Sequence, residues 1–435
     1  MDKSSSDRYN KPWRYALTMF GLSIIGYMYT AYGTFFYNVL LGLPMQTIAL
    51  GTLLFAIWDA FNDPCMGFLS DRTRTRFGRR RPWLLVSVPL FMLASIMFFS
   101  PPEALGSGTA LAVFYIFFLL LTETANTIAS VNYHSLLPEL FREEKRRNRA
   151  NAIRQALQLV GMIIGVSMVP LIADQIGYQL TAVFLGVLGG GFVIYSILGC
   201  RERNEFSSLP QPKIFDSFKA VAGNRNFWFV SISHFFYQAT AGLLLAGIPF
   251  FVMFTLEQPD GMAALLSGAV FVTAIPSMLI WYKLINRFGT LMVWRIALAW
   301  LGLSTVPMFF ANDIIVAALA GMLIGIGIAG VTANLDMVNS ELIEEDAVKY
   351  NVRREATFFA SISFITRLSG LVRSGVFLLL FIIFAFESGD NPGEAPGTAA
   401  RFMMVVFPGI LMVCSFVMSL FAHPGKAWGS ENTAA

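Results

Sequence analysis

The stretch WDAFNDP (58–64) determines how this sequence is interpreted. It places Asp59, Asn62 and Asp63 inside an otherwise apolar run, Met45 to Leu69, which is long enough to cross a bilayer as a helix. Ionisable side chains within a membrane are costly, and they usually face a cavity or a partner group. The stretch therefore predicts a membrane span that contains a functional polar site.

The composition is that of a membrane protein. Of the 435 residues, 56% are apolar and 13% are charged, whereas soluble proteins carry about 25% charged residues. This balance excludes a water-soluble enzyme, a disordered chain and a nucleic-acid-binding protein. Cys65, Cys200 and Cys414 lack disulfide or metal spacing, and no nucleophile, base and orienting group stand out together. We expect neither an enzyme nor a bound cofactor.

Apolar stretches of membrane-spanning length occupy the sequence almost from end to end. Each is close to or above the roughly 20 residues that a helix needs to cross the hydrocarbon core. We therefore expect an all-α integral membrane protein with twelve transmembrane helices. The expected spans are Trp13–Leu41, Met45–Leu69, Trp83–Ser100, Thr109–His134, Asn151–Ala173, Tyr178–Cys200, Phe227–Thr255, Met262–Ile285, Met292–Ala311, Ile314–Asn339, Thr357–Phe386 and Phe402–Ala422.

The links between spans alternate in charge. Links 71–81, 141–149 and 201–225 follow even-numbered spans and are basic, and the first of them holds six arginines. The positive-inside rule then places these links and both termini in the cytoplasm. We interpret the arginine runs as solvated, topology-fixing segments, with binding of anionic lipid or a partner as the alternative.

The chain divides into two similar halves. Residues 201–226 form the one sizeable internal linker, which separates an N-terminal six-helix bundle (1–200) from a C-terminal one (227–435). The sequence RFG occurs at 76–78 and again at 287–289, and Glu139-Leu140 returns as Glu341-Leu342. Offsets near 200 residues at equivalent links favour a duplicated six-helix unit, as in transporters whose halves rock around a central site.

Asp59, Asn62 and Asp63 lie on one face of a helix, about one turn apart. Two carboxylates so placed repel each other unless a positive charge or a proton neutralises one of them. A sodium ion bound by carboxylate and amide oxygens, or a proton, would do so. In the alternative, Asn62 and Asp63 hydrogen-bond to a helix kinked by Pro64, and Asp59 pairs with an arginine.

Further polar and charged side chains fall within other expected spans. An arginine keeps its charge at any working pH, so each buried one needs a carboxylate, a carbonyl or an anionic ligand. For Arg295 and Asp336, near the expected cytoplasmic ends, a structural role is favoured over contact with a substrate. The remaining candidates are Glu123, Thr127, Arg154, Arg367 and Arg373.

The stretch 58–64, with DRTRTRFGRRRPW (71–83) after it, resembles the glycoside-pentoside-hexuronide:cation symporters of the major facilitator superfamily. The segments SLLP (135–138) and NVRRE (351–355) are similar in type. The resemblance implies the major facilitator fold, a bacterial cytoplasmic membrane and a solute carried with sodium or a proton. It implies a cation site of Asp59, Asn62, Asp63 and Thr127. A cytoplasmic gating motif is expected at Gly67, Asp71, Arg72, Gly78 and Arg79.

One departure concerns the sugar site. Melibiose-type members use acidic residues in the first and fourth helices, and Ser23 and Ser130 stand at those positions here, so galactoside specificity does not carry over. We expect a small polar or anionic solute, a glycoside or uronic acid, carried by a monomer among membrane lipids. Alternatives are a lysophospholipid as cargo, or a non-transporting receptor or assembly factor. The substrate-binding candidates are Ser23, Glu123, Ser130, Arg154, Arg367 and Arg373, with an anionic group read chiefly by Arg367.

Overall fold

The computed structural model describes residues 10–422, except 74, 76–77, 79, 107, 142, 201–220 and 351–354. Throughout the described residues the regular elements are helices, apart from one isolated bridge between Thr75 and Gly78. By their internal contacts the residues form two compact units. Unit 1 comprises Met1–Pro210 and Glu387–Pro392, and unit 2 comprises Gln211–Phe386 and Gly393–Ala435.

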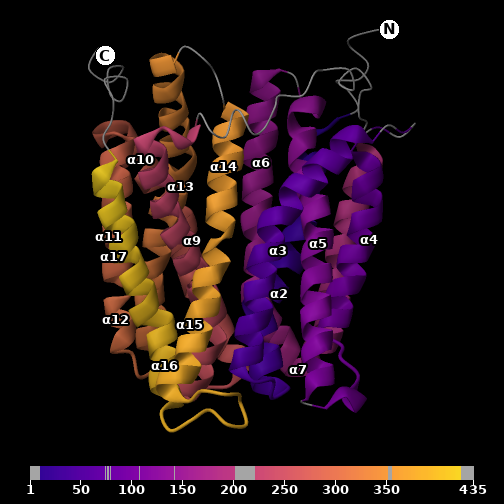
Figure 1. The fold of residues 1–435 in the computed structure, drawn as a ribbon, viewed down its shortest axis with the longest axis vertical. Helices are drawn as coiled ribbons and strands as arrows, with labels where there is room; N and C mark the ends of the chain where they lie inside the picture. The colour runs from indigo at the N-terminus through magenta and orange to yellow at the C-terminus, as the bar shows by residue number, and fades with distance from the viewer. Residues whose placement is uncertain are drawn as a thin grey trace. The chain divides into compact units, whose positions relative to one another are not determined.

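Unit 1 contains the first six spans, whose helices lie alongside one another (Figure 1). Gly177, with a φ of +79°, interrupts α7 and separates the fifth span from the sixth. Glycine lacks a Cβ and adopts this backbone conformation without steric cost. The elements are α2 (Pro12–Phe35), η1 (Phe36–Leu40), α3 (Met45–Arg72), α4 (Arg81–Phe98), η2 (Glu103–Leu105), α5 (Thr109–Leu140), α6 (Glu144–Ile163), η3 (Ile164–Met168) and α7 (Val169–Gly199).

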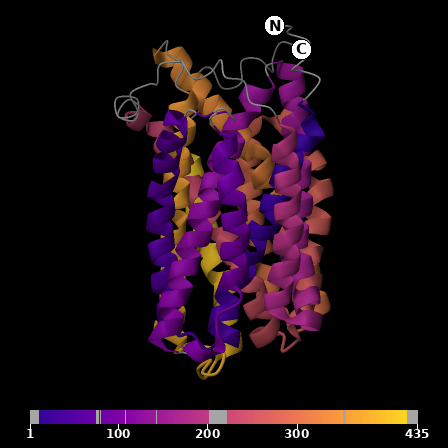
Figure 2. The same ribbon diagram turned by 90° about the vertical axis from the view of Figure 1, so that its right-hand side faces the viewer.

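Unit 2 contains the other six spans (Figure 2), five of which are built from consecutive helical pieces. These composite spans are α9 with η5, η6 with α10, α11 with α12, α14 with α15, and α16 with η7 and α17. The elements are α9 (Arg225–Phe250), η5 (Phe251–Thr255), η6 (Asp260–Met262), α10 (Ala263–Phe288), α11 (Thr290–Ser304), α12 (Val306–Phe309), α13 (Ile314–Tyr350), α14 (Glu355–Arg367), α15 (Ser369–Phe384), α16 (Pro396–Arg401), η7 (Phe402–Val406) and α17 (Phe407–Phe421).

The described helices account for twelve spans. Nine segments are both long and apolar enough to cross a membrane, and one of these, Lys145–Gly199, is 55 residues long and contains two spans divided at Gly177. Helices α2 and α3 have 24 and 28 residues, which is sufficient length, but they are more polar. The expectation of an all-α membrane protein with twelve spans is confirmed.

The two units share one packing plan. In unit 1, α2 packs against α6 and α7, α4 packs against α5 and α7, and α3 packs against α5. In unit 2, α9 packs against α14, α15 and α17, α11 packs against α13 and α17, and α10 packs against α13. Each contact in one unit has a counterpart in the other, as a duplicated six-helix unit requires.

The correspondence extends to individual hydrogen bonds. The first helix of each unit ends in a π-helical turn, which begins at Phe36 in unit 1 and at Phe251 in unit 2, 215 residues later. In unit 1 the Thr18 hydroxyl donates to Ser196 Oγ at 2.7 Å. In unit 2 the hydroxyl groups of Ser233 and Ser415 form the equivalent contact at 2.9 Å.

Glycines allow the closest helix contacts within each unit. A Cβ atom on Gly161 would lie 2.6 Å from the carbonyl oxygen of Phe20, and one on Gly325 would lie 2.1 Å from that of Val270. Both distances are shorter than a Cβ atom can tolerate. These glycines therefore set the spacing between α2 and α6 and between α10 and α13, as small residues do in membrane helix pairs.

The segment Glu387–Pro392 packs in unit 1, although it follows α15 of unit 2 in sequence. The fully buried Asn38 donates from Nδ2 to the Glu387 carbonyl at 2.8 Å, and Gly389 N donates to the Asn38 carbonyl at 3.0 Å. A Cβ on Gly389 would lie 2.2 Å from the Val39 carbonyl oxygen. The range 227–435, expected as one bundle, is therefore interrupted by six residues that pack elsewhere.

Candidate functional site

A buried polar cluster lies along the middle of three helices of unit 1. Helix α2 contributes Tyr29, α3 contributes Asp59 and Asn62, and α5 contributes Glu123 and Thr127. These five side chains are between 1% and 7% exposed. Because α3 packs against α5, and α2 also contacts α5, residues far apart in sequence come together there.

Glu123 is the centre of this cluster. The Tyr29 hydroxyl donates a hydrogen bond to Glu123 Oε2, and the Thr127 hydroxyl donates to Glu123 Oε1 at 3.3 Å. The Tyr29 hydroxyl also interacts electrostatically with both Glu123 and Asp59. The hydrogen bond from Tyr29 thus joins α2 to the Glu123 carboxylate of α5.

The electrostatics of this cluster favour a bound cation or proton. Two carboxylates in a low-dielectric interior repel each other, so neutralising one of them lowers the free energy of the site. Carboxylate, hydroxyl and amide oxygens are hard ligands, of the type that bind hard metal cations. Among the described residues, no group of three or more His, Cys, Asp or Glu side chains is arranged to hold a metal ion. The oxygen donors of the cluster are of the type that suits a hard cation, and its carboxylates are groups that accept a proton.

The other residues of the acidic stretch differ in their surroundings. Asn62 is 4% exposed, and its Nδ2 atom has no hydrogen-bond partner within the described residues. Asp63 is only half-buried. Helix α3 continues past Pro64 to Arg72, so the proline does not end the span. Asp59 and Asn62 are thus the deeper members of the stretch.

Arg154 lies away from this cluster. Its Nε donates to Asn151 Oδ1 at 3.0 Å, and its NH1 contacts His134 Nδ1 at 3.0 Å. His134 and Glu123 are eleven residues apart on α5, which corresponds to about 16 Å along the helix axis. Arg154 therefore connects α6 to the end of α5 and does not reach the carboxylates.

The arginines of the eleventh span belong to unit 2. Arg367 is the last residue of α14, and the turn at Leu368 separates it from α15. The Arg373 guanidinium lies beside Gly242 of α9, where an added Cβ would be 3.8 Å from NH1. Both side chains are half-buried. In contrast, Arg295 donates to the carbonyls of Ser419 and Ala422 at 3.1 and 2.8 Å, which is the structural role expected for it.

Ser23 and Ser130, which stand where melibiose-type members have acidic residues, pack against neighbouring residues. Ser23 is 3% exposed and lies against α6, where a Cβ on Gly161 would be 2.9 Å from its Cβ. Its Oγ atom has no hydrogen-bond partner within the described residues. Ser130 is half-buried, and its hydroxyl donates to Asn126 Oδ1 on the same helix at 3.4 Å.

The residues of the expected gating motif lie at the end of α3 and before α4. Gly67, Asp71 and Arg72 lie in the last two turns of α3, and Arg79 lies outside the described residues. Gly78 has a φ of +107°, which favours glycine. The Thr75 hydroxyl donates to the Gly78 carbonyl at 2.7 Å, and the Trp83 indole donates to the Thr73 hydroxyl at 2.8 Å. The first bond joins Thr75 to Gly78, and the second joins the start of α4 to the residue that follows α3.

Sequence reasoning missed Tyr29 and assigned Glu123 to the substrate. Four other tyrosines lie in the same expected span as Tyr29: Tyr15, Tyr27, Tyr32 and Tyr37. No local feature of the sequence distinguishes Tyr29 from them. The four-residue spacing of Glu123 and Thr127 places both on one face of α5, and this is the signal that could have joined Glu123 to the cation site.

Solved structures with a similar fold are membrane transporters. The nucleoside transporter NupG has a TM-score of 0.71 at 12% identity, covering 93% of this chain and 98% of that one. A bacterial homologue of the human lysosomal transporter Spinster, in an inward-facing and unoccupied conformation, has a TM-score of 0.60 at 14% identity, covering 97% and 96%.

Related sequences are named as symporters. The uncharacterized symporter YnaJ of Bacillus subtilis is 27% identical over 60% of this chain, and the match spans 59% of the length of YnaJ. The sodium-dependent lysophosphatidylcholine symporter 1 of Mus musculus is 24% identical over 83% of this chain and 75% of its own. The putative glycoside/cation symporter YagG of Escherichia coli is 22% identical over 88% and 85%.

The family assignment rests on most of the chain. Residues 14–423 match the model of the MFS/sugar transport protein family, and this range includes all twelve spans. The chain belongs to this family of major facilitator transporters.

Proposed function

We propose that this protein is a secondary active symporter that moves a small polar or anionic solute together with a cation bound in unit 1. The observation that carries the proposal is the burial of two carboxylates, Asp59 and Glu123, within membrane-spanning helices of unit 1, where the Tyr29 hydroxyl donates to Glu123. An ionisable side chain buried within a membrane helix is costly, and it is a candidate functional site by default.

The coupling ion is sodium or a proton. The cation site comprises Asp59, Asn62, Asp63 and Thr127, extended by Glu123. Binding of one positive charge removes the repulsion between the carboxylates and lowers the cost of enclosing them. The conformational change that encloses the site then becomes favourable only when cation and solute are both bound, which is the requirement for symport.

For the solute, we favour an anionic group bound by Arg367 with Arg373 assisting. A guanidinium offers a planar fork that binds a carboxylate through two parallel hydrogen bonds. Arg154 is a weaker candidate because Asn151 and His134 already engage its side chain. In the competing account, Arg367 pairs only with an acidic residue and stabilises one conformation.

A lysophospholipid is the second candidate cargo. The named lysophosphatidylcholine symporter of Mus musculus matches 83% of this chain, while the putative glycoside/cation symporter matches 88%. Identities of 24% and 22% do not separate the two substrate classes, so a direct measurement is needed.

Uptake into proteoliposomes tests the function. We would supply a labelled hexose, the corresponding hexuronate and a lysophosphatidylcholine, each with a sodium gradient, a proton gradient or neither. Accumulation of the hexuronate that requires one gradient supports the proposal, and loss of the preference for the acid in Arg367→Gln supports direct recognition. Gradient-dependent movement of the lysolipid alone would replace the solute with the second candidate, and absence of any gradient-dependent uptake would contradict symport.

The proposed setting is a bacterial cytoplasmic membrane, with a monomeric protein and both termini in the cytoplasm. This orientation can be tested by cysteine labelling in a Cys65→Ser background, because Cys65 is exposed. Glu103→Cys and Glu394→Cys, at exposed positions, should react from outside, and Lys145→Cys should react only after permeabilisation. Reversed reactivity at any of these positions would contradict the orientation.

A further inference from the structure

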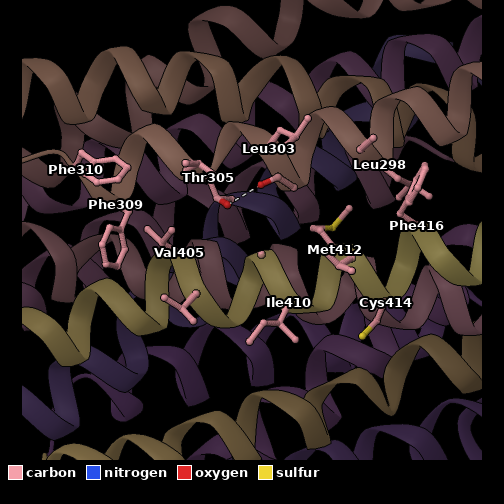
Figure 3. A pocket seen from close by; sticks show the side chains of 16 residues that line it. Leu298, Leu303, Thr305, Phe309, Phe310, Val405, Ile410, Met412, Cys414 and Phe416 are labelled. Carbon is pink, nitrogen blue, oxygen red and sulfur yellow. Dashed lines mark hydrogen bonds between the residues drawn. The ribbon is translucent and has the colours of Figure 1, made fainter.

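An apolar groove lies in unit 2 between α11 and α17. Its volume is about 730 Å³. Figure 3 shows side chains of α11 and α12 along one wall and of η7 and α17 along the other. The lining includes Leu298, Leu303, Phe309, Phe310, Ile410 and Met412. The Thr305 hydroxyl in this lining donates to the Gly302 carbonyl at 2.8 Å. Its hydrogen-bond donor is therefore satisfied without a polar ligand.

The groove has the length of one leaflet of a bilayer. Its lining on α11 and α12 extends from Leu298 to Phe310, twelve residues or about 18 Å of helix. Half of the roughly 30 Å hydrocarbon core is about 15 Å. Since Phe310 ends the ninth span, the groove extends from one membrane face to about the middle of the bilayer.

Two glycines leave space along the groove. A Cβ on Gly409 would lie 3.5 Å from Thr305 Oγ1, an ordinary van der Waals contact. One on Gly302 would lie 3.2 Å from the Cβ of Met412. A larger side chain at Gly409 would thus be tolerated by the backbone but would occupy the groove. The groove depends on the absence of that side chain.

A fixed cation stands at the membrane-face end of the groove. Arg401 precedes η7, and its guanidinium donates to the Phe309 carbonyl at 3.1 Å, the Ala311 carbonyl at 3.4 Å and Asn312 Oδ1 at 2.5 Å. These bonds use NH1 and NH2, and they leave Nε–H and a second N–H of NH1 as donors. The neighbouring Asp313 carboxylate accepts from the backbone of α13 at Ile315.

We propose that this groove binds one acyl chain of a membrane phospholipid whose phosphate is bound by Arg401. An apolar groove within a bilayer excludes water and offers hydrocarbon contacts along the depth of a leaflet, which suits an acyl chain. A guanidinium held at the membrane face offers charge-assisted hydrogen bonds to a phosphate. The two features together match the two ends of one phospholipid, and neither depends on the transported solute.

Photolabelling in nanodiscs tests the proposal. The probe is a phospholipid with a diazirine in its acyl chain, and labelled positions are mapped by mass spectrometry. Leu303, Ile410 and Val413 should be labelled several-fold more than Val272 and Leu279 of α10, which have comparable exposure of 55–71%. Equal labelling of both sets would contradict the proposal, because equal labelling is the result expected when lipid surrounds the protein without a specific site.

Variants separate the acyl chain from the phosphate. Gly409→Leu should lower groove labelling several-fold, whereas Gly268→Leu on α10, where a Cβ meets no atom within 4 Å, should not. In Arg401→Gln, labelling of the groove by the phospholipid probe should fall to the level given by a diacylglycerol probe with the same acyl chain. Arg401→Lys should retain most of the phospholipid labelling. Unchanged labelling in Gly409→Leu, or cross-links between two copies of the protein at the groove, would overturn the assignment.

Discussion

The two units have the same packing plan but different interiors. The first helices of the units are offset by 215 residues at their π-turns, and α5 and α13 are offset by 202 residues at the repeated Glu-Leu pair. With these offsets the polar cluster of unit 1 corresponds to apolar or small residues in unit 2. The pairs are Tyr29 with Leu244, Glu123 with Gly325, and Thr127 with Ala329.

This difference separates the demands of folding from those of function. In unit 2, Gly325 lets α13 approach the Val270 carbonyl of α10, so the equivalent helix pair packs at this point without a carboxylate. A six-helix unit of this kind therefore does not require the carboxylates. Burying Asp59 and Glu123 is costly because both are ionisable. We therefore propose that they serve cation coupling and not folding.

The largest effect is expected for Glu123→Gln, which removes one of the two interacting charges. Gradient-driven accumulation should fall at least about tenfold. A loss of about 1.4 kcal/mol of cation-binding free energy is enough to lower the cation affinity tenfold. The matched control is Glu341→Gln on α13, whose carboxylate accepts from the Thr290 hydroxyl in unit 2. Equal loss of accumulation in both variants would contradict the proposal that the coupling carboxylates lie in unit 1 and not in unit 2.

A smaller effect is expected for Tyr29→Phe, which removes the hydroxyl that donates a hydrogen bond to Glu123. A hydrogen bond to a charged group contributes about 1.5–3 kcal/mol, so the cation concentration for half-maximal uptake should rise about tenfold. The control Tyr237→Phe removes a hydroxyl contact with Thr332 in unit 2, at 3.0 Å, and should leave cation dependence unchanged. An unaltered cation dependence in Tyr29→Phe would remove this residue from the site.

A change in stability, not in coupling, is expected for Gly325→Ala. Overpacking of this kind typically costs about 1–3 kcal/mol, because the new Cβ would meet the Val270 carbonyl. The melting temperature in detergent should fall by several degrees, while the cation dependence of the remaining activity is retained. Gly268→Ala, with open space at its Cβ, should melt as the parent does, and a similar fall in both would contradict the packing argument.

The smallest effect is expected where Glu387–Pro392 packs on unit 1. Asn38→Ala removes the side-chain donor to the Glu387 and Leu43 carbonyls, a loss of about 1 kcal/mol for each of the two neutral hydrogen bonds. A cysteine at the exposed Glu394 should then react with thiol reagents at an unchanged rate, while one at the buried Ser388 should react faster. Unchanged reactivity at Ser388 would show that Asn38 does not hold the segment.

The sequence was sufficient for the spans and for part of the site. Helix length and apolarity are local properties, so twelve spans could be counted, and the spacing of Asp59 and Asn62 predicted one polar face. The contact between Tyr29 and Glu123 depends on how α2 and α5 pack, which no local pattern records. The packing of Glu387–Pro392 in unit 1 could not be anticipated for the same reason, since its neighbours in sequence belong to unit 2.

The most direct test compares two transport modes in Asp59→Asn proteoliposomes. Exchange of labelled for unlabelled solute requires only binding and conformational change, whereas accumulation also requires the cation gradient. If the carboxylates of unit 1 form the coupling site, Asp59→Asn should retain exchange and lose gradient-driven accumulation. Full accumulation in this variant, also when combined with Asp63→Asn, would contradict the assignment of cation coupling to unit 1.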